Sequence, residues 1–244
     1  MSIGFDNWFA SYYNIEQGDD MEIRPIARIY TDFDSKFAIP RQSGLVGELE
    51  GVVVFEPQYR SPEALRGLER FSHIWLIWEF SQNTDQKWSP TVRPPKLGGN
   101  KRVGVFATRS PFRPNNLGLS CVELKGIEKS EKYGSILRVG GADLMNGTPI
   151  YDIKPYLKIT DYIEEAEGAL TENIDTVKVI VSAELLSKLP EEKQSALIKV
   201  LEQDPRPAYQ NEPERIYGFG FAGYEIKFRG TKEEITVTDI VKQA

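Results

Sequence analysis

Three segments of the sequence combine cationic or amide side chains with proline or glycine, as binding loops often do. They are residues 36–42, 104–118 and 143–149. In the first segment, Pro40 fixes the backbone beside Arg41 and Gln42, both strong hydrogen-bonding side chains. The second segment carries Arg109 and Arg113 among prolines and asparagines. Because a planar guanidinium binds carboxylates and phosphates in bidentate geometry, these arginines indicate a site for an anionic group.

Each segment also has an alternative interpretation as an ordinary surface loop. In the third segment, Asn146-Gly147 is typical of a tight turn with no ligand role. No GxxxxGKS or GxxxxGKT motif is present, and Gly98, Gly99 and Gly104 do not form the GxGxxG dinucleotide motif. A doubly wound Rossmann enzyme is therefore not expected.

The histidine and cysteine content excludes several kinds of chemistry. The chain has one histidine, His73, and one cysteine, Cys121. A disulfide, a CxxC redox pair, a zinc site of these residues and a two-histidine mechanism are excluded within one chain, and no metal is expected. His73 lies in the apolar stretch 71–80, which predicts a strand, so we interpret it as a buried histidine rather than a catalytic one.

The charge of the chain is unevenly distributed. With 30 Lys and Arg against 36 Asp and Glu, the net charge is −6, which by itself argues against a nucleic-acid partner. Residues 85–116, however, hold seven basic residues and one acidic residue, a local charge of +6, and the remainder carries −12. Trp88, Phe106 and Phe112 lie among these cations. Cations with interleaved rings suit a nucleic-acid phosphate backbone and unstacked bases, although a solvated basic loop is the alternative.

The hydrophobic pattern predicts a mainly β protein with an α+β appendage. Short β-like runs fall at residues 23–30, 51–55, 71–80, 102–108, 120–127, 135–139 and 151–159. This spacing favours a closed or strongly curved sheet. After a Glu-, Gly- and Asn-rich stretch, a strand at 176–181 precedes a short helix capped by Ser182 and a second helix opened by Pro190. Three alternating strands follow, at 217–221, 224–228 and 235–237.

These patterns predict three parts of the chain. Residues 1–21 form an N-terminal extension, residues 22–163 the β domain and residues 164–244 a smaller α+β domain. Apolar runs fall short of the about 18 residues that cross a bilayer, and the start lacks the layout of a secretory signal. We expect a soluble cytoplasmic protein with no membrane partner.

Several motifs along the chain together resemble those of the TsaA-like/TrmO family of tRNA methyltransferases. They are residues 37–42 (FAIPRQ), 71–75 (FSHIW), 104–119, 146–149 (NGTP) with 152–156 (DIKPY), and 204–209 (DPRPAY). The resemblance implies an S-adenosylmethionine-dependent enzyme whose catalytic domain is a small β-barrel. It implies methylation of N6 of N6-threonylcarbamoyladenosine next to the anticodon, chiefly in threonine tRNA. It also implies a homodimer and a C-terminal domain that recognises tRNA.

The resemblance assigns roles to individual residues. The cofactor would contact Pro40, Arg41, Gln42, Ser81, Gln82, Arg109, Leu119, Asn146, Gly147, Thr148 and Pro149. The tRNA would contact Arg113, Lys154, Arg206 and Tyr209, with Phe112 or Tyr209 as stacking surfaces. Methyl transfer from a sulfonium is an in-line displacement, so the protein must align the reactants, exclude water and handle a proton. Asp152 is the candidate for orienting the acceptor or taking that proton; its alternative role is to anchor the turn at 151–156.

Two alternative functions remain open at this point. Relatives often have His where Ser81 stands and Asp where Asn146 stands, which leaves room for a non-catalytic RNA-binding β-barrel module without a cofactor. The other alternative is an S-adenosylmethionine-dependent methyltransferase that acts on a small molecule or a protein, in which residues 204–209 have no RNA role.

Overall fold

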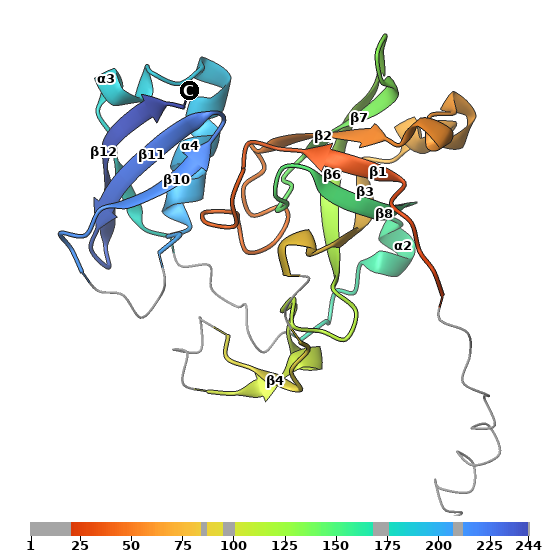
Figure 1. Cartoon of the computed structure of the whole chain (residues 1–244), viewed down its shortest axis with the longest axis horizontal. Coiled ribbons are helices and arrows are strands. Elements are labelled where there is room, and N and C mark those ends of the chain that lie inside the picture. Colours follow the sequence, from red (N-terminus) through yellow and green to blue (C-terminus); the bar gives the residue numbers. More distant parts are fainter. Residues whose placement is uncertain (1–20, 84–86, 95–100, 168–175, 207–211, 244) are drawn as a thin grey trace, which may run out of the picture.

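The N-terminal part of the chain is an antiparallel sheet that closes on itself (Figure 1). The computed structural model describes residues 21–83, 87–94, 101–167, 176–206 and 212–243. The strands of this sheet are β1 (Ala27–Tyr30), β2 (Glu50–Phe55), β3 (His73–Glu79), β6 (Leu117–Ser130), β7 (Gly134–Gly140) and β8 (Thr148–Pro155). Their hydrogen-bonded order is β1-β2-β7-β6-β3-β8, and β8 also pairs with β1, which makes a closed barrel. The mainly β prediction is confirmed.

Alternation along the strands decides which side chains fill the interior. In β3, Ile74, Leu76 and Trp78 are buried, and the residues between them are less so. Each fully buried aliphatic side chain of this kind stabilises the fold by about 1.5–3 kcal/mol. The prediction that His73 is buried is wrong: it is exposed, because strand alternation sets it on the face opposite Ile74. Its Nδ1 lies 3.0 Å from Oγ of Ser72.

Short helices and a hairpin connect these strands. The 3-10 helices η1 (Pro57–Tyr59), η2 (Pro62–Leu65) and η3 (Leu68–Arg70) precede β3, and η4 (Ser81–Asn83) follows it. β4 (Thr91–Val92) and β5 (Val103–Gly104) pair as a separate two-stranded sheet, which projects below the barrel in Figure 1.

Two predicted strands are shorter than expected. Residues 102–108 contribute only β5 before the 3-10 helix η6 (Val105–Ala107), because Thr108 turns back to bond the Val105 carbonyl through both its amide and its hydroxyl. Residues 151–159 leave the sheet at Pro155, which has no N–H to continue the ladder, and enter the short helix α2 (Lys158–Asp161).

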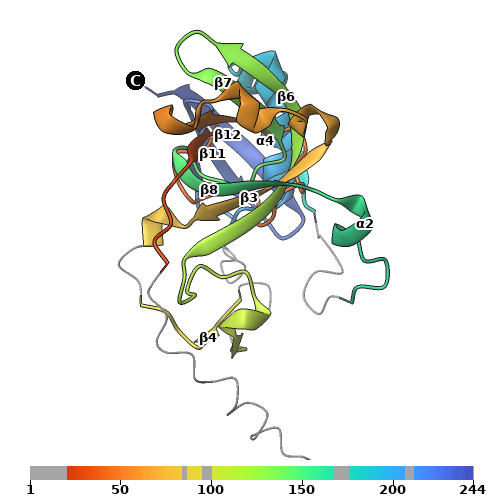
Figure 2. The same cartoon turned by 90° about the vertical axis from the view of Figure 1, so that its right-hand side faces the viewer.

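The C-terminal part is a four-stranded sheet packed against one long helix. The elements are β9 (Lys178–Ile180), α3 (Ala183–Leu186), α4 (Glu191–Glu202), β10 (Tyr217–Phe221), β11 (Tyr224–Gly230) and β12 (Glu234–Lys242). The strand order is β10-β11-β12-β9, with β9 parallel to β12. The predicted cap is confirmed, since Oγ of Ser182 accepts the Leu185 N–H at 3.2 Å. In the view turned by 90°, this sheet and α4 lie behind the six-stranded sheet (Figure 2).

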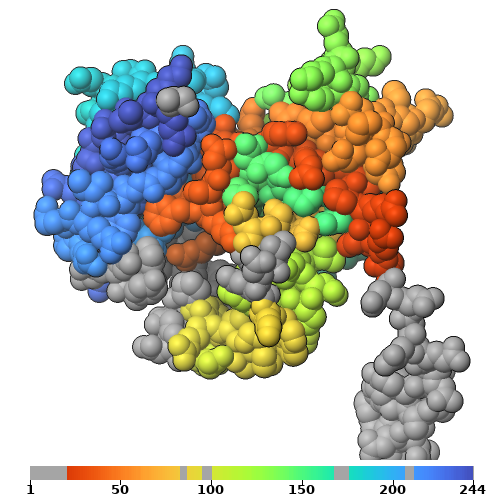
Figure 3. All heavy atoms as spheres, viewed as in Figure 1, coloured from red at the N-terminus to blue at the C-terminus, as the bar shows by residue number. Residues whose placement is uncertain are grey.

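The segment between β1 and β2, residues 31–49, packs against both parts. Phe33, Ala38, Val46 and Leu49 are buried with α4 and the C-terminal strands, in a cluster separate from the interior of the six-stranded sheet. The orange-red atoms of this region lie directly against the blue C-terminal sheet in Figure 3. A segment that lies between two strands of the N-terminal sheet in the sequence therefore belongs to the hydrophobic core of the C-terminal part. Among the described residues, no helix has the length and apolarity that crossing a membrane requires.

Candidate functional site

The loop segments singled out in the sequence meet around one cavity of about 470 Å³. Its described lining includes the predicted residues Pro40, Arg41, Gln42, Ser81, Gln82, Arg109, Arg113, Leu119 and Thr148. Four parts of the chain thus form the cavity lining: the loop after β1, the end of β3, the start of β6 and the start of β8. The topology explains this convergence, because β3 is hydrogen-bonded to both β6 and β8.

Two cationic side chains of the cavity wall, Arg109 and Lys36, donate to amide and carbonyl groups. Nη1 of Arg109 donates to Oε1 of Gln42, which joins the loop after β1 to the loop before β6. Nζ of Lys36 donates to the Gln82 carbonyl at 3.0 Å, joining the first loop to the end of β3. Arg41 and Arg109 are exposed, and their guanidiniums form a cationic rim that suits a carboxylate or phosphate.

Arg113 has a different environment from these two arginines. Its Nη1 donates to the carbonyls of Val105 at 3.1 Å and Thr108 at 2.6 Å, and its guanidinium lies 5.5 Å from the centre of the Phe106 ring. Arg113 therefore holds the loop that carries Arg109, and its predicted contact with tRNA stays a prediction.

The predicted turn at 146–149 supports the cavity more than it lines it. Thr148 is in the described lining, whereas Asn146, Gly147 and Pro149 are not. Nδ2 of Asn146 donates to Oδ1 of Asp34 at 3.1 Å, a bond that an aspartate at position 146 lacks the N–H to make. Gly147 has φ of 78°, in the left-handed region that glycine enters without strain.

A chain of polar side chains at the cavity was not found from the sequence. Nε1 of buried Trp78 donates to Oγ of buried Ser120 at 2.9 Å, and that hydroxyl donates to Oδ1 of Asp143 at 2.6 Å. Trp78 and Asp143 both line the cavity. Burial raises the pKa of the Asp143 carboxyl, although the bond from Ser120 acts in the opposite direction. The only sequence signal for Asp143 was its place in a segment already singled out.

The raised pKa of Asp143 predicts a pH-dependent stability. The folded protein binds this proton more tightly than the unfolded chain does, so the stabilisation is complete below the ordinary pKa of 3.8. It is lost as the pH rises from there through the folded pKa. Relative to an Asp143→Asn variant, the unfolding free energy of the wild type should therefore fall as the pH rises through that window. Above the window, the difference between the two proteins should stay constant. Denaturant unfolding of both proteins at several pH values measures the difference, and a constant difference contradicts the prediction.

A second carboxylate of the cavity, Glu79, bonds a tyrosine. Oη of Tyr151 donates to Oε2 of Glu79 at 2.6 Å. Burial, with the adjacent Glu79 carboxylate, raises the pKa of Tyr151 to about 12. Tyr151 therefore stays a neutral donor at physiological pH and keeps the Glu79 carboxylate fixed at the end of β3.

The predicted proton acceptor Asp152 lies outside this group. It is not among the described residues that line the cavity; its Oδ2 is 2.9 Å from Nζ of Lys154, and both side chains are exposed. Oδ1 of Asp152 accepts the adjacent Ile153 N–H at 2.9 Å, in keeping with the alternative role as a turn anchor. The predicted tRNA contact of Lys154 stays a prediction.

The C-terminal motif at 204–209 has a buried arginine. Arg206 is 6% exposed, and its Nε and Nη2 reach the two carboxylate oxygens of Asp204 at 2.8 and 2.9 Å. The same guanidinium donates to the carbonyls of Gly230 and Thr231. Arg206 thus joins its loop to the C-terminal sheet, which the sequence did not indicate. Tyr209 lies outside the described residues.

An aromatic and basic surface adjoins the cavity. Trp88, Phe106 and Phe112 are exposed, and Nε of the nearby Arg102 donates to Oγ1 of Thr91 at 2.8 Å. The amide of Ser89 bonds the Phe112 carbonyl at 3.1 Å, which ties the hairpin of β4 and β5 to the loop that carries Arg109. Exposed rings and cations are therefore held at the side of the cavity that Pro111 and Arg113 line.

Fold and site together define a protein in which loops and strand ends of a closed antiparallel sheet form a cationic cavity, with an α+β part packed beside it. The chain belongs to the tRNA-methyltransferase O family: the model of the tRNA-methyltransferase O N-terminal domain matches residues 28–162, and that of the TrmO C-terminal domain matches residues 175–243. The family resemblance of the motifs is thereby confirmed.

Individual proteins agree with the family models. The tRNA (adenine(37)-N6)-methyltransferase of Escherichia coli is 40% identical over 220 residues, which cover 86% of this chain and 93% of that protein. A putative S-adenosylmethionine-dependent methyltransferase of Pseudomonas aeruginosa, RcsF, is 40% identical over 80% of this chain and 87% of its own length. A crystal structure of TrmO from Pseudomonas aeruginosa superposes with a TM-score of 0.77 at 32% identity, covering 94% of this chain and 100% of that one.

Proposed function

We propose that this protein methylates N6 of adenosine 37 in tRNA, that this adenosine carries an N6-threonylcarbamoyl group, and that threonine tRNA is its chief substrate. The protein is a methyltransferase and its cofactor is S-adenosylmethionine, in keeping with the family and the names of its relatives. The observation that carries the proposal is the convergence of the motif loops on one cationic cavity.

The residues of the cavity fit this cofactor. Its volume of about 470 Å³ lies within the roughly 300–1,000 Å³ of small-molecule sites. Arg41 and Arg109 match the carboxylate of the cofactor, whereas Asp143 and Glu79 are carboxylates opposite in sign to its ammonium and sulfonium. Leu119 supplies apolar surface. When bound, S-adenosylmethionine supplies an activated methyl group.

The chain's own residues would align the reactants and move one proton. Glu79 and Asp143 are the carboxylates among the described lining residues, so in this proposal one of them, rather than Asp152, takes the proton from the acceptor nitrogen. We take Asp143 as the candidate base, since burial raises its pKa and thereby its proton affinity. The Ser120 hydroxyl at 2.6 Å fixes the orientation of that carboxylate.

The surface beside the cavity supports an RNA substrate. Unstacked bases bind to exposed rings and phosphates to cations, and the β4–β5 hairpin offers both next to the cavity. In the proposal, this surface receives the anticodon arm, residues 22–163 form the catalytic barrel and residues 164–244 help to recognise tRNA. A cytoplasmic homodimer that needs no metal completes the proposal.

A methylation assay tests the proposed substrate. Purified full-length protein and labelled S-adenosylmethionine are incubated with threonine tRNA that carries the threonylcarbamoyl group and with the same tRNA without it. We expect label on the modified tRNA only, and at N6 of adenosine 37 by nucleoside mass spectrometry. Equal labelling of both tRNAs, or of neither, overturns the substrate. Cofactor binding by calorimetry without any transfer to tRNA favours a small molecule or protein as acceptor, and no binding favours a non-catalytic RNA-binding module.

Arg109 provides a prediction at the level of cofactor binding. Hydrogen bonds to charged groups contribute about 1.5–3 kcal/mol, so Arg109→Ala should weaken cofactor binding by roughly 10- to 100-fold. The fold should stay intact, because the side chain is exposed. Arg66→Ala, which removes an exposed guanidinium outside this cavity, is the matched control and should bind as the wild type does. Calorimetry measures both variants, and unchanged affinity of Arg109→Ala removes this residue from the site.

A further inference from the structure

The segment 31–49 has one side on the cofactor cavity. Lys36, Ile39, Pro40, Arg41 and Gln42 all line it. The backbone of the next residue, Ser43, also bonds the Asp143 carboxylate. A large part of one cavity wall therefore comes from a stretch that is neither helix nor strand and has no sheet ladder to fix it.

The other side of the same segment is packed into the C-terminal core. The ring of buried Phe33 meets Phe221 edge-on at 5.5 Å. The ring of Phe37 lies 6.2 Å from Phe219 and is stacked 6.5 Å from Phe228. These partners belong to β10 and β11, which come some 180 residues later in the chain. The C-terminal core is thus completed by rings adjacent to the cavity wall.

The residues between Phe37 and Pro40 join the two sides. Ile39 both lines the cavity and packs against the C-terminal core. Ala38 has φ of 70°, a left-handed conformation that costs an L-residue about 1–2 kcal/mol and persists only where surrounding contacts enforce it. Its side chain is buried in the C-terminal core, two residues before Pro40. The conformation of the wall is therefore sustained by packing outside the six-stranded sheet.

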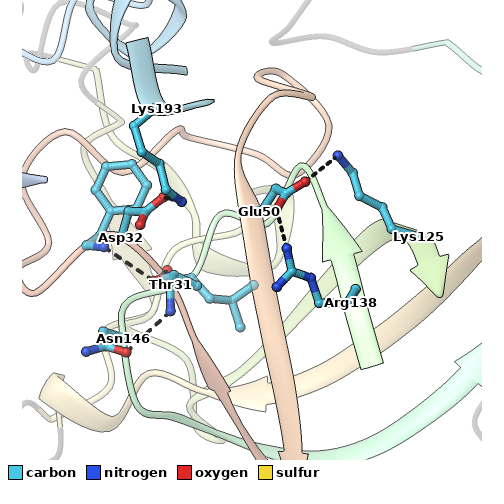
Figure 4. A network of polar contacts seen from close by, with 9 residues as sticks. Thr31, Asp32, Glu50, Lys125, Arg138, Asn146 and Lys193 are labelled. Atoms are coloured by element: carbon cyan, nitrogen blue, oxygen red, sulfur yellow. Dashed lines mark hydrogen bonds and ion pairs between the residues drawn. The ribbon is translucent and has the colours of Figure 1, made fainter. Parts of the chain in front are cut away.

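Polar contacts fix both ends of the segment (Figure 4). At its start, Oδ2 of Asp32 is 2.7 Å from Nζ of Lys193 on α4, and the Asp32 carbonyl accepts the Ala222 amide at 2.9 Å. Just after its end, Glu50 bonds Lys125 at 3.1 Å and Arg138 at 2.6 Å on the six-stranded sheet. One end is held by the C-terminal part and the other by the N-terminal sheet.

We propose that Phe37 and Ala38 are positioning residues: by packing in the C-terminal core, they hold the adjacent cavity wall in the conformation that binds the cofactor. Cofactor affinity then depends on a domain that does not itself line the described cavity. The inference rests on the proposed function only in that the wall binds S-adenosylmethionine. Because coupling between sites is reciprocal, cofactor binding should in turn protect the C-terminal core.

Cofactor affinity of full-length Phe37 variants tests the proposal. Phe37→Ala should weaken S-adenosylmethionine binding at least tenfold by calorimetry, and Phe37→Leu, which refills most of the space, should recover most of the affinity. Val179→Ala is the matched control, since Val179 packs on the same core from β9, at the opposite edge of the sheet from β10. It should lower the melting temperature without changing the affinity. Wild-type affinity in Phe37→Ala, or equal losses in Phe37→Ala and Val179→Ala, overturns the proposal.

Amide hydrogen exchange provides a readout that needs neither tRNA nor methyl transfer. In folded Phe37→Ala, exchange at residues 36–42 should rise relative to the wild type, and in Val179→Ala it should not. If Phe37→Ala does not fold, the wild type is measured with and without S-adenosylmethionine, and protection of β10 and β11 is expected. Unchanged exchange in these comparisons contradicts the positioning role. Failure of the wild type to methylate modified tRNA overturns the proposed substrate instead, and leaves this comparison intact.

Discussion

Replacing Arg206 by alanine is expected to lower the free energy of unfolding by about 3–5 kcal/mol, the usual loss when one partner of a buried ion pair is removed. The side chain of Arg206 is 5% exposed, and that of Asp204 is 29% exposed. Removing the guanidinium takes its N–H donors from the Asp204 carboxylate and from the carbonyls of Gly230 and Thr231, and leaves Asp204 only the backbone N–H of residue 206. Denaturant unfolding at neutral pH measures the loss.

An arginine on β11, the strand whose Gly230 carbonyl Arg206 contacts, provides the control for this experiment. Arg229 pairs with Glu214 at 3.0 Å, but both side chains are largely exposed, so Arg229→Ala should cost no more than about 1 kcal/mol. The sequence motif predicts that Arg206 contacts tRNA, whereas its contacts predict a stabilising role. An Arg206→Ala protein as stable as Arg229→Ala, but with weakened tRNA binding, supports the tRNA contact and contradicts the structural one.

Replacing Gly118 by alanine is expected to disrupt the cofactor cavity. A β-carbon at this position would lie 2.7 Å from Cδ2 of the Trp78 indole and nearer still to Cε2. The indole would have to move, at the about 1–3 kcal/mol typical of overpacking, and would leave the 2.9 Å bond to Ser120. Because Trp78, Gly118 and Asp143 all line the cavity, we expect cofactor affinity to fall at least tenfold.

Another glycine of the same strand separates this steric effect from a general effect on β6. A β-carbon at Gly126 meets no atom within 4 Å, so Gly126→Ala should keep both stability and cofactor affinity close to the wild-type values. Calorimetry and thermal unfolding of the two variants make the comparison. If Gly118→Ala binds the cofactor as tightly as Gly126→Ala, the indole does not hold the cavity in its binding shape.

The local features of the site were predictable from the sequence, but its chemistry was only partly so. Proline, arginine and glycine marked the loops that meet at the cavity, because these residue types restrict the backbone or bind anions wherever they occur. The sequence did not point to the chain from Trp78 through Ser120 to Asp143. That chain depends on strand register, since Trp78 pairs with Gly118 on β6 and thereby faces Ser120 two residues further on.

The sequence by itself determined four properties: the family, a closed or strongly curved sheet in the N-terminal part, the α+β C-terminal part and the loops that carry the site. These properties follow from composition, alternation and motif order, which act over a few residues at a time. The tertiary structure alone decided that residues 31–49 complete the C-terminal core, that His73 faces outward and that Arg206 is buried. The physical reason is that burial depends on contacts between segments far apart in the chain. Nothing in the sequence around Phe37 or Phe228 predicts that their rings stack on each other.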